Sequence, residues 1–175
     1  MKTKINKKKG MTLLIAVVLT TTLLLISFAI SRIAYKQQIL TFSAKDSEVA
    51  FYAADSGTEC ALYHDLKAAP NFFATPVEQT TGTIECSGVA IENADVTTGG
   101  NTAITKFAYN LNNTDPKSCA IIKVTKTLID VNGEDIILTE IESRGYNNTC
   151  DTSNQGNSTI DSGPRNLERA LRVTY

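Results

Sequence analysis

The feature that most constrains this chain is an uncharged, apolar run near its N-terminus. No Asp, Glu, Lys or Arg occurs from Met11 to Ser31. A helix needs about 20 mostly apolar residues to span a bilayer, so this run is long enough to cross one. The threonines Thr20 to Thr22 dilute it, but a helix tolerates them because a hydroxyl can bond to the preceding turn. The run therefore needs lipid or other apolar helices around it.

A cleaved secretory signal is the first alternative for this run. Its apolar core normally has about 7–15 residues and ends at a small-x-small site, which Ser27-Phe28-Ala29 matches weakly. The sequence does not turn irregular there, since residues 32–40 continue without glycine or proline. Mostly small residues then recur at spacings of three and four: Val49, Ala50, Ala53, Ala54, Gly57, Ala61 and Leu62. Because the first proline is Pro70, we predict one helix over residues 11–67, about 85 Å long.

The charges are distributed unevenly around the run. Five lysines precede Gly10, whereas the first acidic residue is Asp46. Without residues 1–10 the chain has 12 cationic and 18 acidic residues, a net charge of about −6. Lysines beside an apolar span favour the cytoplasmic side of a membrane, so the acidic remainder is expected on the other side. The remainder has no basic stripe, which argues against nucleic-acid binding.

The cysteines indicate an oxidising compartment rather than a metal centre. Cys60, Cys86, Cys119 and Cys150 form no C-x-x-C motif. An even number of cysteines outside the cytoplasm suggests two disulfides, for which three pairings exist. We favour Cys60–Cys86 and Cys119–Cys150, because each closes a short loop and contributes about 3–4 kcal/mol in the chain-entropy model. Four reduced, buried thiols remain the alternative.

After Pro70 the sequence changes to β-type patterning. Five segments rich in Thr, Val, Ile and Tyr are predicted strands: Thr83–Ile91, Ala103–Leu111, Ser118–Ile129, Asp135–Arg144 and Asn166–Tyr175. Asn132-Gly133 suits a type I′ hairpin turn, and residues 147–164 are predicted to form a long surface loop. In the last strand Arg169 interrupts an otherwise apolar face. We expect an α+β fold with an antiparallel sheet packed on the second half of the helix.

Catalytic and cofactor motifs are missing from the sequence. Acyl transfer needs a nucleophile, a base and an orienting group, but His64 is the only histidine, and no motif supports a reactive thiol at Cys60. We expect His64 on the surface near the end of the helix, where a cation is favoured. There is neither a phosphate-binding loop nor a dinucleotide fingerprint. We therefore expect no enzyme activity, no metal and no cofactor.

Two stretches resemble type IV pilin-like proteins. The first is Lys7-Lys-Lys-Gly10 followed directly by Met11-Thr-Leu-Leu-Ile-Ala-Val-Val. The second, from Val49 to Leu62, is similar to the helix of PilX-type minor pilins. The resemblance implies that a prepilin peptidase cuts after Gly10 and methylates Met11. It also implies that other pilin-like subunits are partners through the helix, in the cytoplasmic (inner) membrane or in a filament.

One position departs from the pattern of these families. They usually carry a glutamate at the fifth mature position, where this chain has Ile15. The resemblance implies that this carboxylate neutralises the N-terminal amine of an adjacent subunit, because an unpaired charge in hydrocarbon costs several kcal/mol. Ile15 cannot receive that amine. Its presence favours a tip or priming subunit, or a membrane protein that does not polymerise, over a major filament subunit.

The sequence thus divides into four segments with two interpretations. The segments are a leader (1–10), a transmembrane half-helix (11–31), an amphipathic half-helix (32–67) and an extracytoplasmic sheet domain (68–175). The favoured interpretation is a minor pilin or pseudopilin that primes assembly, adheres or contacts cargo. The alternative is a single-pass, signal-anchored membrane protein that presents a binding domain.

Overall fold

The fold is described from a computed structural model, which defines residues 9–68, 72–78, 83–91, 94–161, 163 and 165–175. Its elements comprise one long helix and an antiparallel sheet, so the predicted α+β class is confirmed. The contacts divide the chain into two compact units, Met1–Ala44 and Lys45–Tyr175. The long helix, α1 (Lys9–Tyr63), contributes to both units. A π-helical turn, η1 (His64–Ala68), follows it, so helical structure ends one residue beyond the expected end.

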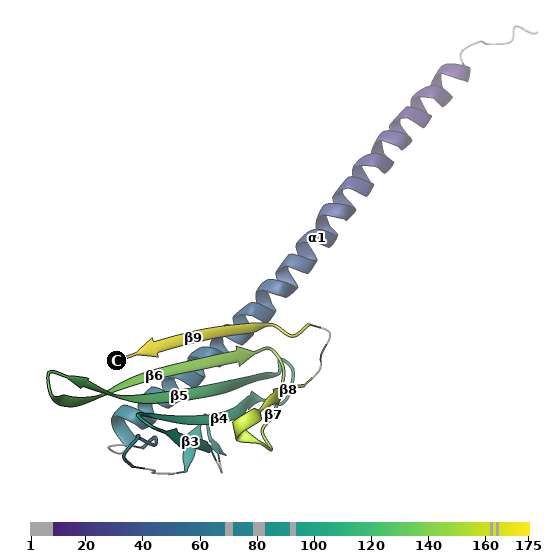
Figure 1. The fold of residues 1–175 in the computed structure, drawn as a ribbon. Helices are drawn as coiled ribbons and strands as arrows, with labels where there is room; N and C mark the ends of the chain where they lie inside the picture. Colours follow the sequence, from purple (N-terminus) through teal and green to yellow (C-terminus); the bar gives the residue numbers. More distant parts are fainter. Residues whose placement is uncertain (1–8, 69–71, 79–82, 92–93, 162, 164) are drawn as a thin grey trace, which may run out of the picture. The chain divides into compact units, whose positions relative to one another are not determined.

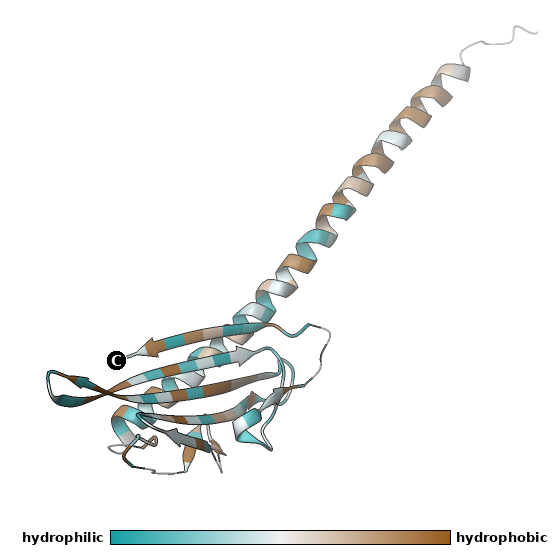
Figure 2. Cartoon of the chain, in the orientation of Figure 1, coloured by the Kyte–Doolittle hydropathy of each residue, from teal (hydrophilic) through white to brown (hydrophobic). Residues whose placement is uncertain are grey.

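The described part of the first unit, from Lys9 to Ala44, is entirely helical. Every side chain from Met11 to Ala44 is exposed within the chain. Figure 2 shows that this part of α1 is predominantly hydrophobic. A helix that is apolar all round is normally buried in a protein core or in a membrane, and this one has no core of its own.

The second unit is built on a five-stranded antiparallel sheet with the order β3-β4-β5-β6-β9 (Figure 1). Its strands are β3 (Asp95–Gly99), β4 (Thr102–Asn112), β5 (Ser118–Val131), β6 (Glu134–Tyr146) and β9 (Glu168–Thr174). Four of them correspond to predicted strands. The short edge strand β3 was not predicted, because Asp-Val-Thr-Thr-Gly is polar and brief.

Two smaller features correct the sequence-based prediction. Thr83–Ile91 is not one strand but a tight hairpin of β1 (Ile84–Cys86) and β2 (Val89–Ile91), whose Ser87-Gly88 turn was overlooked. The stretch predicted as a surface loop contains β7 (Cys150–Asp151) paired with β8 (Thr159–Ile160), and a 3₁₀ turn, η2 (Gln155–Asn157). Short polar strands carry too little hydrophobic alternation to be recognised.

The turn between β5 and β6 is the one that the sequence predicted. Asn132 and Gly133 have φ angles of 59° and 86°, and β5 and β6 pair in register up to Val131 and Glu134. Positive φ at both central residues is the requirement of a type I′ turn, which asparagine and glycine satisfy at low cost. The side chain of Asp130 accepts a hydrogen bond of 2.8 Å from the Gly133 amide and so supports the turn.

The core of the second unit lies where the small-residue stripe of α1 meets the sheet. Ala50, Ala53, Ala54, Gly57 and Ala61 are all buried. A Cβ on Gly145 of β6 would overlap backbone atoms of the helix, from the Ala50 carbonyl to the Ala54 amide. The two backbones therefore approach as closely as glycine allows. The small residues of the stripe permit this close approach, and their spacing of three and four places them on one face of the helix.

Candidate functional site: the apolar segment of the helix and the fold behind it

The proposed processing site lies at the beginning of α1. Gly10 and Met11 are both within the helix, which begins at Lys9. Lys7 and Lys8, which complete the basic motif, fall outside the described residues. Ile15, at the position that usually carries a glutamate, is 51% exposed, so the described residues leave it accessible.

Three adjacent threonines in the apolar run satisfy their hydroxyls within the helix. The hydroxyls of Thr20, Thr21 and Thr22 donate to carbonyl oxygens three residues earlier, at distances of 3.0, 2.9 and 2.9 Å. An unsatisfied hydroxyl in hydrocarbon costs free energy, and these bonds remove most of that cost. The three threonines are therefore compatible with a lipid environment.

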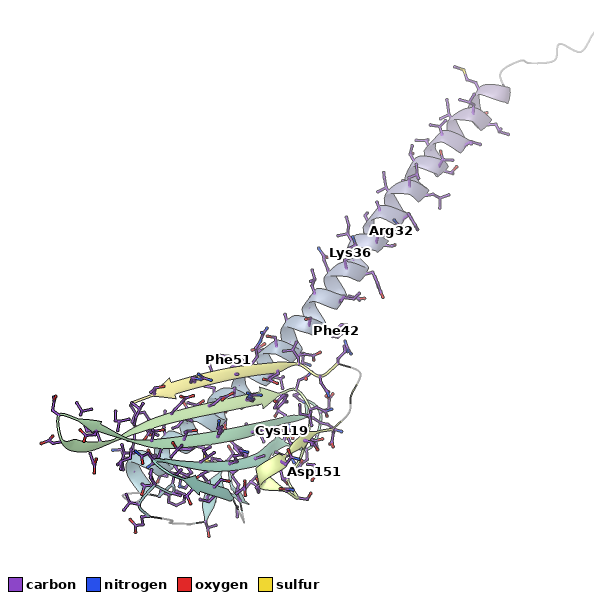
Figure 3. The ribbon with its side chains drawn as sticks, viewed as in Figure 1. Arg32, Lys36, Phe42, Phe51, Cys119 and Asp151 are labelled. Atoms are coloured by element: carbon purple, nitrogen blue, oxygen red, sulfur yellow. A yellow bond between two sulfur atoms is a disulfide. The ribbon has the colours of Figure 1, made fainter. Side chains whose placement is uncertain are left out.

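The first cation after the run is arranged like a residue at a membrane surface. The Arg32 guanidinium lies over the Phe28 ring, 4.7 Å from its centroid. Long cationic side chains can bury their stems along apolar surface while the charge reaches water. Figure 3 shows Arg32 and Lys36 one turn apart on α1. Among the described residues, one helix is long and apolar enough to cross a membrane, and it is this one.

In the second unit, the helix also carries uncovered aromatic side chains. Phe51, Tyr52 and Tyr63 are exposed, whereas the small residues between them face the sheet. An amphipathic helix on a soluble domain normally presents charged or polar residues to solvent. These exposed rings leave apolar surface on the helix that another apolar element can cover.

Two disulfides hold the second unit together, with the pairing that the sequence favoured. Cys60 of α1 bonds to Cys86 of β1, and Cys119 of β5 bonds to Cys150 of β7. The first disulfide ties the end of the helix to the β1–β2 hairpin. The second ties the sheet to the segment that follows β6. Disulfides of this kind form in oxidising compartments, which agrees with a domain outside the cytoplasm.

His64 is buried, so the expectation of a surface histidine is wrong. Its Nε2 lies 3.1 Å from the Glu85 carbonyl oxygen, and its ring packs against Phe72 with centroids 4.6 Å apart. The π-helical turn that begins at His64 directs the ring inward. One possible ligand atom each of Cys60, His64 and Cys86 lies within 4.8 Å of the others. Because the two sulfur atoms are joined in a disulfide, neither is a thiolate that could bind a metal or attack a substrate.

A buried ion pair locks the end of the helical region to the sheet. The Lys126 ammonium lies 2.5 Å from the Asp65 carboxylate, and their side chains are only 6% and 4% exposed. Tyr175 donates a 2.7 Å hydrogen bond to the same carboxylate, and burial together with this bond raises the pKa of Tyr175. This cluster was not predicted from the sequence. Its signal was strand alternation, which puts Lys126 on the same face as the buried Ile122 and Val124.

The other face of the sheet carries a cross-strand network of charges. Glu142 of β6 lies between Arg144 and Arg172, and the closest contact is 2.7 Å from Arg144. The hydrogen bond from Arg144 is the main reason that the pKa of Glu142 is lowered. The Tyr146 hydroxyl donates to Glu168, and burial, with this bond, raises the pKa of Tyr146 to about 12.

Arg169, which interrupts the apolar face of β9, is explained by a contact with the helix. Its Nε donates a 2.8 Å hydrogen bond to the Ser47 hydroxyl. The bond links β9 to the first turn of α1 in the second unit.

Comparison with known proteins gives no match. No family model matches the chain, and no curated protein or solved structure matches it.

Proposed function

We propose that this chain is a minor pilin or pseudopilin, a structural subunit without enzymatic activity. A prepilin peptidase removes residues 1–10 and methylates Met11, and the remaining helix holds the subunit in the cytoplasmic membrane. The acidic sheet domain lies outside. The subunit then joins a type IV pilus-like filament, at or near its tip, and primes assembly, adheres or contacts cargo.

The observation that carries this proposal is the complete exposure of the helix from Met11 to Ala44. A long, apolar helix that begins at Lys9 and that no other described element covers requires apolar surroundings. Lipid supplies them before assembly, and the helices of neighbouring subunits supply them afterwards. The exposed rings of Phe51, Tyr52 and Tyr63 offer further surface for such neighbours.

Ile15 supports a tip position within this proposal. A subunit inside the filament shaft receives the N-terminal amine of a neighbour, which needs a carboxylate partner in an apolar setting. Ile15 has no charge to offer, and a terminal subunit has less need of one.

The experiment that tests the processing step is co-expression with a prepilin peptidase, followed by mass spectrometry of the N-terminus. We expect a methylated Met11 as the first residue. Gly10→Leu should block cleavage, whereas Gly99→Ala, far from the cut in sequence and with nothing within 4 Å of the added Cβ, should not. An intact Met1, or a cut after Ala29, would contradict the proposal.

The alternative function is a single-pass anchored protein that presents a binding domain. The same exposed helix and disulfide-bonded sheet favour it, since a membrane anchor also needs only lipid around it. It predicts an unprocessed N-terminus and a chain that stays in the membrane fraction when the assembly apparatus is present.

A further inference from the structure

Three side chains that can bind a metal converge where the end of the helical region meets the β1–β2 hairpin. They are Cys60 of α1, His64 of η1 and Cys86 of β1, and one ligand atom of each lies within 4.8 Å of the others. Cys60 and His64 are four residues apart, a spacing at which two side chains of a helical segment can share one metal ion. In the described part of the chain, no other three such donors lie this close together.

His64 has one ring nitrogen with an unused lone pair. Its Nε2 lies 3.1 Å from the Glu85 carbonyl oxygen, and a carbonyl only accepts hydrogen bonds, so Nε2 carries the proton. In the neutral ring Nδ1 is then unprotonated, and it is buried without a hydrogen-bond partner among the described residues. A buried polar atom without a partner calls for an explanation, and binding of an ion is one of the few. Metal-binding histidines typically donate their other N–H to a carbonyl in this way.

The donors are held in place from both sides. The His64 ring packs against Phe72, and the side chains of His64 and Cys86 are buried. The Sγ atom of Cys60 lies 3.7 Å from the same Glu85 carbonyl oxygen that accepts from His64. Cys60 itself is only partly buried. The cluster is therefore preorganised on its inner side and accessible from solvent at Cys60.

Two thiolates and one imidazole are a donor set that suits zinc. Bonds of about 2.3 Å to sulfur and about 2.0 Å to nitrogen put neighbouring donors of a tetrahedral site about 3.5–3.8 Å apart. The three donors already lie within 4.8 Å of one another, so a small movement brings them to that geometry. Two thiolates also neutralise the charge of Zn²⁺, which lowers the cost of burying the ion. The thiolates are available only after the disulfide has been reduced.

We propose that the reduced form of this chain binds one zinc ion through Cys60, Cys86 and His64, with water in the fourth position. A dithiol passes two electrons and two protons to the Cys60–Cys86 disulfide, which leaves two thiols on the chain and the oxidised dithiol. Zinc then displaces the two thiol protons. The metal takes over the connection between α1 and the hairpin that the disulfide makes in the oxidised chain. The site depends neither on processing of the N-terminus nor on assembly.

The test uses the full-length chain in detergent, with cobalt(II) as a spectroscopic probe of a zinc site. The chain is reduced with a phosphine, freed of metal and titrated with Co²⁺. We expect thiolate-to-cobalt charge-transfer absorption and the intense visible bands of tetrahedral cobalt, which saturate at one ion per chain and are bleached by Zn²⁺. The oxidised chain should show neither. Absence of these bands from the reduced chain, or their presence in the oxidised chain, would overturn the proposal.

Paired substitutions identify the ligands. Replacing Cys60 and Cys86 by serine should abolish the bands, whereas replacing Cys119 and Cys150, the other disulfide, is the matched control and should leave them unchanged. His64→Gln should weaken zinc binding at least about tenfold, since even loss of a group that orients a ligand has an effect of that size. Equal loss in the two cysteine pairs, or unchanged affinity in His64→Gln, would overturn the assignment.

Hydrogen exchange distinguishes a folded site from thiols of an unfolded chain. Zinc added to the reduced chain should slow exchange at the end of α1, around Cys60, because the metal ties it to the hairpin again. The same addition to the His64→Gln chain should slow it less. Zinc that binds without slowing exchange there is bound by unfolded chain, and this result would also overturn the proposal.

Discussion

The two parts of α1 share one backbone geometry but differ in the size of their side chains. Up to Ala44 the helix is rich in Leu, Ile, Val and Thr, and none of its side chains is covered. From Lys45 onward, alanines and a glycine form the face that packs on the sheet. Large apolar side chains suit lipid or an interdigitating neighbour, whereas a close helix–sheet contact needs small ones. Side-chain volume, rather than hydrophobicity alone, distinguishes the part that folds with its own domain.

The largest expected effect follows from the closest point of that packing. Gly145→Ala would force a Cβ into the backbone of α1 near Ala50 and Ala54, which cannot move aside as a side chain can. We expect it to lower the free energy of unfolding of the second unit by more than about 4 kcal/mol. Chemical denaturation followed by near-UV circular dichroism measures this. Gly99→Ala, where nothing lies within 4 Å of the new Cβ, is the control and should change it little.

Removal of the helix-to-hairpin disulfide should have the next largest effect. Replacing Cys60 and Cys86 by serine opens a loop with a sequence separation of 26 residues, which should cost about 3–4 kcal/mol. Hydrogen exchange should increase at the end of α1, around Cys60, and not before Ala44. Replacing Cys119 and Cys150 is the matched control, since it should destabilise the sheet without increasing exchange at the helix. Equal exchange in both variants would contradict the role given to the first disulfide.

Loss of the buried cation should cost slightly less. Lys126→Met leaves the Asp65 carboxylate buried without its partner, and we expect a loss of about 3 kcal/mol. Lys126→Met combined with Asp65→Asn removes the charge as well and should recover most of the stability. Urea denaturation of the two variants checks this. If the double variant is no more stable than the single one, the cost does not come from the unpaired charge.

The sequence was most informative where one physical requirement dominates. Three patterns each permit few structures: an uncharged run of this length, an Asn-Gly pair and a stripe of small residues. From them the long helix, the β5–β6 turn and the face of the helix that allows close packing were predicted. The buried Lys126–Asp65 pair and the inward turn of His64 were missed for a common reason. His64 is held by Glu85 and Asp65 by the sheet, and these partners are distant in the sequence. In addition, a charged or polar residue in a sequence is normally expected to be exposed.

The candidate site could be predicted only in part. Gly10, Met11 and Ile15 were selected from the order of residues, and the structure adds that Ile15 is uncovered. The cross-strand charge network on the sheet escaped notice because it is formed by strand register. Glu142, Arg144 and Arg172 come together only when β6 and β9 are paired.

A charge in the apolar part of the helix should affect membrane insertion and not the domain. Ile15→Glu adds the carboxylate usual in the pilin-like families at a position with no covering element. In a bilayer, for the isolated chain, it should cost about 2–3 kcal/mol of insertion free energy. Denaturation of the second unit should be unchanged, because Ile15 lies in the other unit. Ile15→Leu is the control; a shift in the unfolding midpoint with Glu would show that the two units are energetically coupled.

The smallest expected effect is a loss of stability of the second unit at alkaline pH. Burial raises the pKa of Tyr146 from 10.0 to about 12, with a further contribution from Glu168. The unfolded chain therefore releases this proton near pH 10 while the folded chain retains it, so stability that is present below pH 10 is lost as the pH rises toward 12. We expect a loss of about 1 kcal/mol, less than the full shift implies, because solvent screens the half-exposed Glu168. Tyr146→Phe should remove that part of the alkaline slope of the unfolding free energy, and an unchanged slope would mean that Tyr146 titrates alike in the folded and unfolded chain.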